Sequence, residues 1–476
     1  MSSEPSRRDF LKLSAAGAIV AKATGVAAGL GDAPAPEPQS GKVTVHVTGG
    51  KLRYEAQPAL SWKGGAAGAN VIELNPGKKF QEMVGFGAAF TDAACYTFNR
   101  LDAPVREQLF HELFHPAEMG LNVCRTCIGS SDYSTEVFSY DEGAPDPEMK
   151  RFSIAHDQPY VLPMMREARK QNPDLFLFSS PWSPPGWMKA GGSMLGGSMR
   201  RHNFAPYALY FVKFLQEYAA EGVPIQAVTV QNEVDTDQDG RMPACSWPQE
   251  YEMGFVKGHL GPALQKAGLS TKIWILDHNY NLWGRAVAEL DDPDVHKYCN
   301  AVAFHGYVGT PGQMSQFHKA YPDAQICWTE GGPDYTSPDY GTDWAKWGQT
   351  FTQAIRNWSQ SITGWNLALD EEGRPNIGPF PCGGLVTIDS QTREVTRSGQ
   401  YWAFAHFSRN VRRGAKRFES SGTVQGVDHV AFENPGGQRV LVLTNQGEAK
   451  MVTLKQASKV IELAIATDSV TTVGWS

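Results

Sequence analysis

The chain has 476 residues, a formal net charge of −7 and an aromatic content of 11%. This length allows a large barrel with a smaller attached unit. No long run carries charges of one sign, so neither nucleic acid nor an anionic membrane surface is indicated as a partner. The seven cysteines are few and odd in number, and they do not indicate a disulfide framework.

The first thirty residues are predicted to be an export signal. The run Ser6-Arg7-Arg8-Asp9-Phe10-Leu11-Lys12 matches the twin-arginine consensus, and a modest apolar stretch follows at 13–21. That stretch is too short to stay as a membrane span. We therefore expect a bacterial protein that is exported in the folded state to the periplasm or the extracellular space, with residues 31–41 as a linker rich in Pro, Ala and Gly.

Short strand patterns occur near both ends of the chain. Residues 43–48 and 71–74 precede the helix-rich region, and residues 424–475 show only strand patterns separated by turn signals such as Asn434-Pro435-Gly436-Gly437. The N-terminal strands need partners outside a strand–helix array, and the C-terminal strands are the natural ones. We predict a β-sandwich built from residues 42–78 and 383–476.

Between these ends, strand and helix patterns alternate with a steady period. The strand candidates are 83–90, 121–128, 175–180, 225–231, 271–276, 301–305, 325–329 and 363–369. Eight such units fit an α/β fold of the (β/α)8 TIM-barrel type over residues 79–382, because such barrels span about 250 residues. A doubly wound sheet is the alternative. Polar residues at almost every strand end favour the barrel, because chemistry gathers at that rim.

Two of the predicted strands end in a glutamate. The stretch 225–233 is mostly apolar or β-branched before Gln231, Asn232 and Glu233, and the stretch 324–332 is mostly apolar or β-branched before Glu330 and two glycines. In parallel α/β folds the carboxyl ends of the strands share one face. Two carboxylates on that face are the minimal apparatus of glycoside hydrolysis, in which one protonates the leaving oxygen and the other stabilises or attacks the sugar.

This chemistry requires one neutral and one ionised carboxyl at the same pH. Two close carboxylates arrange this themselves, because the charge on one raises the pKa of the other. An asparagine beside the acid, such as Asn232, can donate a hydrogen bond to the 2-hydroxyl of the sugar. The pattern therefore favours a glycosidase over a non-catalytic sugar-binding protein, which has no need of both Glu233 and Glu330.

Five stretches of the chain resemble glycoside hydrolase family 30, and its glucosylceramidase-like branch most of all. They are Gly85-Phe86-Gly87-Ala88-Ala89-Phe90-Thr91-Asp92-Ala93-Ala94, Ser180-Pro181-Trp182-Ser183-Pro184-Pro185-Gly186-Trp187-Met188-Lys189, Gln231-Asn232-Glu233, Thr329-Glu330-Gly331 and Gly364-Trp365-Asn366-Leu367-Ala368-Leu369. The resemblance is colinear from about residue 80 to the C-terminus. It implies a retaining enzyme with a barrel and an appended β-sandwich, and no cofactor or metal.

The resemblance also implies roles for individual residues. Glu233 is the expected general acid/base and Glu330 the expected nucleophile. The supporting residues are those expected to bind the sugar or to hold the nucleophile ionised: Asp132, Trp182, Asn232, His305, Tyr307, Trp365 and Arg125. A retaining mechanism further predicts about 5–5.5 Å between the carboxyl groups of Glu233 and Glu330, against about 6.5–9.5 Å in inverting enzymes.

The chain departs from that branch near the mouth of the expected site. The loop after Asn376 lacks the second sugar-contacting asparagine, and Gly306 stands where the branch places a tryptophan. The expected substrate is a carbohydrate or glycolipid with a β-glucosidic bond. Glucosylceramide, a β-1,6-glucan cleaved by endo action and a smaller glucoside all stay open, as does the oligomeric state.

One motif points to a different class of enzyme. His111-Glu112-Leu113-Phe114-His115 matches the His-Glu-x-x-His pattern of zinc hydrolases, in which two histidines on one helix face bind the metal. However, Pro116 ends the helix at the second histidine, and no third ligand follows at a recognised spacing. The helix also belongs to the outer ring of the predicted barrel, where the chemistry of such folds does not occur. The zinc-hydrolase alternative is therefore disfavoured.

Overall fold

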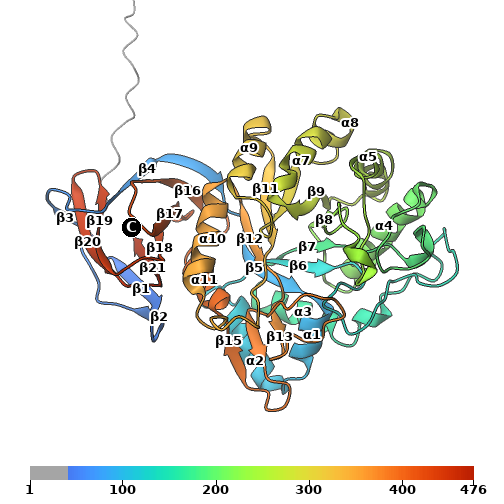
Figure 1. The fold of residues 1–476 in the computed structure, drawn as a ribbon, viewed down its shortest axis with the longest axis horizontal. Coiled ribbons are helices and arrows are strands. Elements are labelled where there is room, and N and C mark those ends of the chain that lie inside the picture. The colour runs from blue at the N-terminus through green and yellow to red at the C-terminus, as the bar shows by residue number, and fades with distance from the viewer. Residues whose placement is uncertain (1–40) are drawn as a thin grey trace, which may run out of the picture. The chain divides into compact units, whose positions relative to one another are not determined.

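The structure, a computed structural model, describes residues 41–476. The predicted export signal and all but the last residue of the predicted linker lie outside the described residues. Among the helices of the described part, none has the length and apolar character that crossing a bilayer requires. Figure 1 shows a ring of parallel strands surrounded by helices and a separate part made of strands alone.

Eight parallel strands form a closed barrel, as the sequence predicted. Its circular order is β10-β11-β12-β5-β6-β7-β8-β9. The strands are β5 (Gly85–Phe90), β6 (Val123–Cys127), β7 (Phe176–Ser180), β8 (Ala227–Thr229), β9 (Lys272–Asn279), β10 (Ala301–His305), β11 (Gln325–Glu330) and β12 (Ser361–Gly364). A barrel closed by hydrogen bonds on every side has no free edge, which explains why these apolar segments are stable as strands.

The interior of the barrel is filled with side chains. A cluster inside it takes residues from six successive strands, among them Phe178 on β7 and Trp274 on β9, whose ring centroids are 4.9 Å apart. Alternate residues of the same strands, such as Val302 and Phe304, instead join the larger core outside the barrel. Because the interior is packed in this way, a ligand can enter only at one rim.

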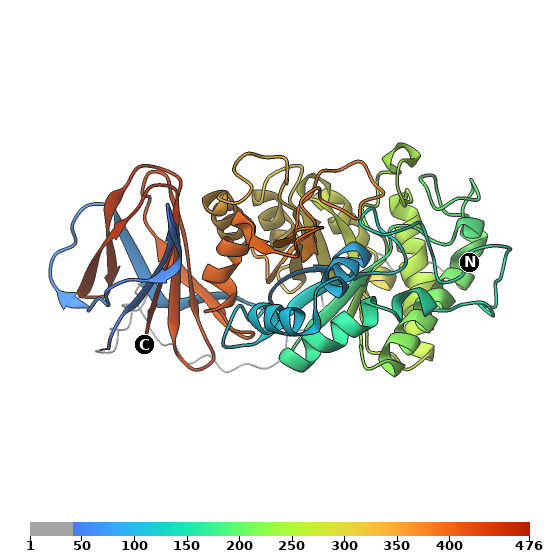
Figure 2. The same cartoon turned by 90° about the horizontal axis from the view of Figure 1, so that it is seen from below.

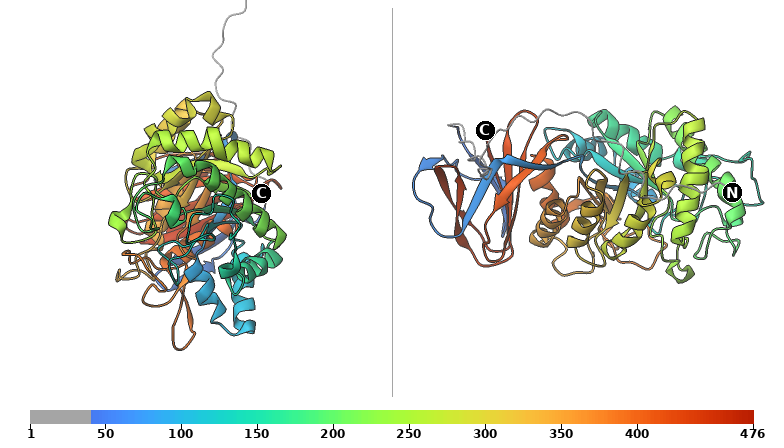
Figure 3. Two further views of the ribbon diagram at one scale, coloured as in Figure 1. Left: turned by 90° about the vertical axis from the view of Figure 1, so that its right-hand side faces the viewer. Right: turned by 90° about the horizontal axis from the view of Figure 1, so that it is seen from above.

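Helices cover the outside of the barrel (Figures 1 and 3). They are α1 (Asp92–Asn99), α2 (Ala103–Phe114), α3 (Val161–Gln171), α4 (Phe204–Ala220), α5 (Gln249–Phe255), α6 (Gly261–Lys266), α7 (Trp283–Leu290), α8 (Pro293–His296), α9 (Gly312–Ala320), α10 (Trp344–Arg356) and α11 (Gly399–Ser408). On α4 the buried residues Tyr207, Phe211, Phe214 and Tyr218 recur at helical spacing and form its inner face.

The last predicted barrel strand is wrong in its extent. Residues 363–369 do not form one strand, because β12 ends at Gly364 and Asn366 has a φ of 51°. The chain then forms β13 (Ala368–Leu369), which pairs with β14 (Val386–Ile388), and β14 pairs with β15 (Val395–Arg397). The left-handed residue turns the chain out of the barrel, and the turn leaves Trp365 at the rim.

The second part is a ten-stranded sheet that folds over one apolar core (Figure 2). Its strands are β1 (Thr44–Gly49), β2 (Leu52–Ala56), β3 (Lys63–Gly64), β4 (Val71–Glu82), β16 (Lys416–Ser421), β17 (Val427–Glu433), β18 (Arg439–Asn445), β19 (Lys450–Gln456), β20 (Lys459–Ile465) and β21 (Ser469–Trp475). β1 pairs with β21, and β4 lies between β16 and β19. The predicted β-sandwich from both ends of the chain is confirmed.

The structure moves the predicted boundary between barrel and sandwich. Residues 383–411 were assigned to the sandwich, but the first C-terminal strand of the ten-stranded sheet is β16. Helix α11 instead packs against α10 and β5 of the barrel. Nine of its ten residues are buried, so it lacks the polar stripe by which an amphipathic helix is recognised in a sequence.

Candidate active site

Most of the predicted site residues meet at one pocket above the packed barrel. It has a volume of roughly 480 Å³, and the predicted residues that line it are Asp132, Trp182, Asn232, Glu233, Tyr307, Glu330 and Trp365. The two remaining ones, Arg125 and His305, are fully buried behind its wall. The predicted residues therefore lie together at the carboxyl ends of the strands, as a (β/α)8 barrel requires of a functional site.

The carboxylate of Glu330 is held by a cation and a phenol. It is the last residue of β11, and its Oε2 accepts a hydrogen bond from Nη1 of Arg125. The hydroxyl of Tyr307 donates to its Oε1 at 3.1 Å. Charge-assisted donors favour the ionised form of a carboxyl group. Glu330 is therefore presented to the pocket as an oriented anion.

Arg125 joins this anion to a second one beneath it. Its Nη2 donates to Oδ2 of Asp277 at 2.7 Å and to Oδ1 of Asn232 at 2.8 Å. Burial lowers the pKa of Arg125, but the charges of Asp277 and Glu330 raise it above its ordinary value. A fully buried guanidinium needs such partners, because an unpaired buried charge is strongly unfavourable.

Asp277 is the centre of the polar network below the pocket. Its Oδ2 accepts from Ser180 and Thr229, both at 2.7 Å, in addition to Arg125, and its Oδ1 accepts from Thr329 at 2.8 Å. Burial raises the pKa of Asp277, but Arg125 and His305 outweigh it and hold the pKa well below its usual range. Asp277 directly follows the predicted strand 271–276, but it was not among the predicted site residues.

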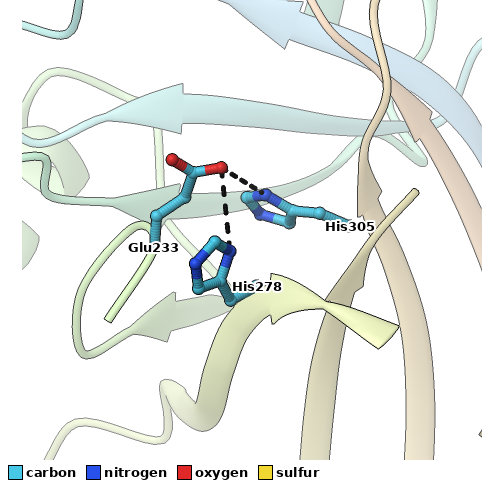
Figure 4. Close-up of side chains that lie close together, drawn as sticks. All are labelled: Glu233, His278 and His305. Atoms are coloured by element: carbon cyan, nitrogen blue, oxygen red, sulfur yellow. Dashed lines mark ion pairs between the residues drawn. The ribbon is translucent and has the colours of Figure 1, made fainter. Parts of the chain in front are cut away.

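Glu233 faces the pocket from the loop after β8. Its backbone has a φ of 54°, and its amide donates to the carbonyl of Asp277 at 3.0 Å. The Nε2 of Gln238 donates to Oε2 of Glu233 at 2.7 Å. The other oxygen, Oε1, lies 3.4 Å from Nδ1 of His305 and 3.7 Å from Nδ1 of His278 (Figure 4). Glu233 is thus surrounded by an amide and two imidazoles, whereas a guanidinium and a phenol bind Glu330.

The carboxyl groups of Glu233 and Glu330 both interact with the imidazole of His305. Burial lowers the pKa of His305, but the charges of Glu330, Asp277 and Glu233 raise it to about 9. Burial raises the pKa of Glu233, whereas the His305 and His278 rings and the Gln238 amide lower it below its ordinary value. In the absence of a ligand, the proton of the Glu233–His305 pair therefore resides on the imidazole.

Sequence reasoning missed His278, which lines the pocket beside Glu233. In a regular strand Asp277 and His278 would point to opposite faces. The pairing of β9 with β10 shifts at this point, and Leu276 and Asp277 have φ values of 73° and 44°. This bulge turns both side chains toward the site, a use of bulges that is common beside active sites. The only signal in the sequence is the position of His278 directly after a polar strand end.

The opposite wall is aromatic. The rings of Trp182 and Trp365 stack with centroids 5.1 Å apart, and the Arg125 guanidinium lies 4.7 Å from the Trp182 ring. Asp132 completes this wall. Burial and the charges of Glu330 and Glu233 raise the pKa of Asp132 well above its ordinary value. A neutral carboxyl beside an aromatic face is a polar group that can both donate to and accept from a sugar hydroxyl.

Comparison with known proteins identifies the family. The model of the glycosyl hydrolase family 30 TIM-barrel domain matches residues 83–411, and that of the glycosyl hydrolase family 30 beta sandwich domain matches residues 414–473. The chain belongs to glycoside hydrolase family 30. The resemblance seen in the sequence is thereby confirmed, and the protein is a glycosidase that acts on carbohydrate.

Family 30 members that are named for different activities resemble the chain to similar degrees. It is 32% identical over 408 residues to an endo-1,6-beta-D-glucanase of Neurospora crassa, covering 81% of this chain and 84% of the relative. It is 28% identical over 453 residues to the lysosomal acid glucosylceramidase of Mus musculus, covering 89% and 86%. The solved structure of the endo-beta1,6-glucanase BT3312 superposes with a TM-score of 0.83 at 29% identity, covering 92% of this chain and 100% of that one.

The mouth of this family 30 pocket is apolar, and a buried ring beside it accounts for Gly306, one departure seen in the sequence. Val308 and Phe380 are exposed there, and Met242 also lines the pocket. A side chain at Gly306 would place its Cβ 2.6 Å from the ring of Trp328. Only glycine fits at this position, because the Trp328 ring already occupies the space.

The His-Glu-x-x-His motif does not contribute to the pocket wall. The rings of His111, in the last turn of α2, and His115, just after its end, stack with centroids 4.3 Å apart. Glu112 turns away from them, and its carboxylate accepts from Nε of Arg397 at 2.7 Å and from the hydroxyl of Tyr401. Within residues 41–476, the three side chains of the motif do not form the convergent set that a zinc hydrolase requires.

Proposed function

We propose that this protein is a retaining β-glycosidase that hydrolyses β-glucosidic bonds by double displacement. Glu330 is the nucleophile and Glu233 the general acid/base. The observation that carries this assignment is the difference between the two carboxyl groups. Arg125 and Tyr307 bind Glu330 as an anion, whereas Glu233 shares a proton with His305.

In the first step, an oxygen of Glu330 attacks the anomeric carbon as the bond to the leaving oxygen breaks. Glu233 gives its proton to that oxygen, and a covalent glycosyl-enzyme results. In the second step, water attacks the same carbon, Glu233 takes a proton from the water, and Glu330 leaves as a carboxylate. Two inversions return the β configuration of the sugar.

His305 supplies the proton that the first step needs. A sugar that fills the pocket excludes water and disfavours the ionised form of Glu233 further, because burial raises its pKa. The proton then moves from Nδ1 of His305 to Oε1 of Glu233, which are 3.4 Å apart. We expect kcat/KM to fall as the pH rises through the alkaline pKa of this pair, because the deprotonated pair cannot protonate the leaving oxygen.

The apolar mouth supports a glucoside whose aglycone is apolar next to the bond, such as a glucosylceramide. Tyr307, Val308 and Phe380 are large apolar or aromatic side chains that stay exposed at the pocket. Exposed apolar groups gathered at one cavity are typical of a binding surface. A β-1,6-glucan is the second candidate, because two endo-1,6-beta-D-glucanases are 32% and 33% identical to the chain.

A substrate panel separates these candidates. Purified protein is offered aryl β-glucosides, glucosylceramide in detergent, β-1,6-glucan, and the aryl β-xyloside and β-fucoside. We expect the aryl β-glucoside and glucosylceramide to be cleaved with the highest kcat/KM, with full activity after dialysis against a chelator. A clear preference for the xyloside or fucoside would contradict the β-glucosidic assignment, and binding without any turnover would contradict catalysis.

Azide rescue tests which carboxylate has which role. In Glu233→Ala, substrates with a good leaving group still form the glycosyl-enzyme, because that step needs little protonation. Azide then attacks the intermediate held by Glu330 and gives a β-glycosyl azide. An α-glycosyl azide from this variant, or rescue of a Glu330→Ala variant to a β product, would show that the two roles are reversed.

We also propose that the protein is exported by the twin-arginine route, which the run Arg7-Arg8 supports. Replacing both arginines with lysine is expected to hold the protein in the cytoplasm of a host that has this pathway. Immunodetection in cell fractions measures the outcome. Unchanged appearance of the doubly substituted protein outside the cytoplasm would contradict the proposed route.

A further inference from the structure

Three possible metal-binding atoms converge at the edge of the pocket. They are Oε1 of Glu233, Nδ1 of His305 at 3.4 Å from it, and Nδ1 of His278 at 3.7 Å from it (Figure 4). The candidate ligand atoms of these three residues all lie within 4.8 Å of one another. The three side chains come from separate places in the chain, since Glu233 follows β8, His278 lies in β9 and His305 ends β10.

Each imidazole is held at its other nitrogen by a carboxylate. Nε2 of His278 lies 2.5 Å from Oδ1 of Asp235, and Nε2 of His305 lies 3.0 Å from Oδ1 of Asp277. In metal sites, a carboxylate behind a ligating histidine fixes the orientation of the ring and increases its basicity. Both histidines of this cluster already have that support, with Nδ1 directed at the shared point.

Both Nδ1 atoms are buried, and among the described residues each approaches Oε1 of Glu233 without forming a hydrogen bond of good geometry. The side chain of His305 is fully buried and that of His278 is 7% exposed. A buried polar atom without a partner is unfavourable and calls for an explanation, such as an ion that binds there. Here two such nitrogen atoms approach the same carboxylate oxygen, which is an arrangement that a metal ion between them would satisfy.

We propose that Glu233, His278 and His305 form a binding site for a divalent transition-metal ion, Zn²⁺ first, and that the bound ion switches the enzyme off. The binding site stands on the geometry alone. The inhibition rests on the proposed function, in which Glu233 is the acid/base. A metal bound to Oε1 prevents that carboxylate from giving a proton to the leaving oxygen and from taking one from water.

The ligand set selects the kind of metal. Imidazole nitrogens suit Zn²⁺ and Cu²⁺, whereas Ca²⁺ and Mg²⁺ take oxygen ligands. Tetrahedral Zn²⁺ with bonds of about 2.0–2.2 Å separates its ligand atoms by roughly 3.3–3.6 Å. The distances of 3.4 and 3.7 Å from Glu233 are close to this spacing. Because Glu233 and His278 both line the pocket, the ion has a path of entry.

A direct binding measurement tests the site without any use of activity. Chelator-stripped protein is titrated with Zn²⁺ by isothermal calorimetry. We expect one tight site per chain, loss of that site in His278→Leu, and affinity about 10–100-fold lower in Asp235→Asn, which removes only the carboxylate behind the ring. Asp235 is half-exposed, so its variant tests the site even if His278→Leu fails to fold.

The matched control is a pair of histidines outside the pocket. His111 lies in the last turn of α2 and His115 follows its end, four residues on, and the pair offers Zn²⁺ a surface site of the ordinary kind. His111→Gln removes that pair and is expected to leave the tight site unchanged. Loss of the tight site in His111→Gln, or its persistence in a folded His278→Leu variant, would overturn the proposal.

A second measurement links binding to inhibition. Hydrolysis of an aryl β-glucoside is followed at increasing Zn²⁺, with each variant compared to its own metal-free rate. We expect inhibition at the concentration that fills the calorimetric site, full recovery on adding a chelator, and a shift of the midpoint by about 10–100-fold in Asp235→Asn. Saturation of the site with no loss of rate would overturn the switch.

The inactive Glu330→Gln variant separates failure of this proposal from failure of the proposed function. Glu330 is not a ligand, so this variant is expected to bind Zn²⁺ within a few-fold of the wild-type affinity while it hydrolyses nothing. A protein that binds Zn²⁺ tightly but cleaves no β-glucoside would reject the function and keep the site. A protein that cleaves β-glucosides but has no tight site would reject only the metal proposal.

Discussion

Two arginines of this protein each lie between two buried carboxyl groups, yet only one of these triads faces a cavity. The rim triad consists of Arg125 with Asp277 and Glu330, and its side chains are 0%, 0% and 8% exposed. Seven further contacts to hydroxyl, amide and imidazole groups surround it, and one carboxylate, Glu330, lines the pocket. The triad can therefore offer an oriented anion to a ligand.

The outer triad consists of Arg285 and Glu289 on α7 with Glu252 on α5. Nη2 of Arg285 lies 2.7 Å from Glu252, and Nε lies 2.8 Å from Glu289. Glu252 also accepts from the amide of Leu276, so the triad joins two helices to the strand that carries Asp277. Burial and the charge of Glu252 raise the pKa of Glu289 well above its ordinary value.

The comparison shows that a buried arginine with two carboxylates is not by itself a functional site. Both triads perturb pKa values, which is a common but uncertain sign of function. They differ in where the charge is directed. In the rim triad the arginine lowers the pKa of Asp277 and one oxygen of Glu330 reaches a cavity, whereas in the outer triad the pKa of Glu289 is raised and the group joins helices together.

The largest effect that should separate the triads is the loss of Glu330. Glu330→Gln removes the nucleophile while the amide keeps its shape, so we expect kcat on an aryl β-glucoside to fall by roughly 10⁴-fold or more, because the covalent step is lost. The thermal midpoint should change little, because Glu330 lies at the pocket and not in the packed core. A variant that retains a tenth of the wild-type kcat would remove Glu330 from the nucleophile role.

The outer triad should respond in the opposite way. Arg285→Met leaves two buried carboxyl groups without their cation, and we expect the free energy of unfolding to fall by about 3–5 kcal/mol. Below the melting range kcat should stay within about twofold of wild type. Chemical denaturation and steady-state kinetics measure the two quantities. Arg241→Met, which removes an exposed ion pair, is the control and should cost less than about 0.5 kcal/mol.

A large fall in kcat with Arg285→Met, in protein shown to be folded, would break the comparison. It would mean that the outer triad transmits its geometry to Asp277 and the pocket through β9. The structure offers such a connection, because Glu252 accepts from the amide of Leu276, the residue before Asp277. Our expectation is that the remaining contacts of Asp277 hold it in place.

Much of the rim could be predicted from the sequence because each strand ends where apolar residues give way to polar ones. Strand β10 is observed at the predicted residues, and β11 extends the prediction only by Glu330. Periodicity could not show that Asp277 and His278 both face the site. That depends on a bulge with two left-handed residues, which arises from the pairing of β9 with its neighbour.

The other differences have related causes. Helix α11 was missed because it is buried on almost every side and has no amphipathic period. The predicted last strand was too long because Ala368 and Leu369 are apolar and buried, as a barrel strand would be, but belong to a different sheet. In each case tertiary burial determines the structure, and a single sequence records burial only indirectly.

A smaller effect sharpens the account of the rim. Tyr307→Phe removes the hydroxyl that donates to Oε1 of Glu330 at 3.1 Å. A hydrogen bond to a charged group contributes about 1.5–3 kcal/mol, so we expect kcat to fall by roughly 10–150-fold. Tyr207→Phe is the matched control, because the described structure gives its buried hydroxyl no hydrogen-bond partner. Equal kinetics in the two variants would show that Arg125 alone orients the nucleophile.

The smallest effect tests the neutral carboxyl of the outer triad. With its pKa raised, folded Glu289 keeps a proton that the unfolded chain loses above about pH 4.3, so stability falls as the pH rises from there toward the folded pKa. Glu289→Gln keeps the oxygen that accepts from Arg285 and has no proton to retain. We therefore expect the variant to be more stable than wild type by about 1 kcal/mol at pH 8, with no advantage near pH 4. Chemical denaturation across this range measures the difference. A variant that is less stable by about 3 kcal/mol at pH 8 would mean that Glu289 is ionised. The outer triad would then be, like the rim triad, an arginine paired with two carboxylates.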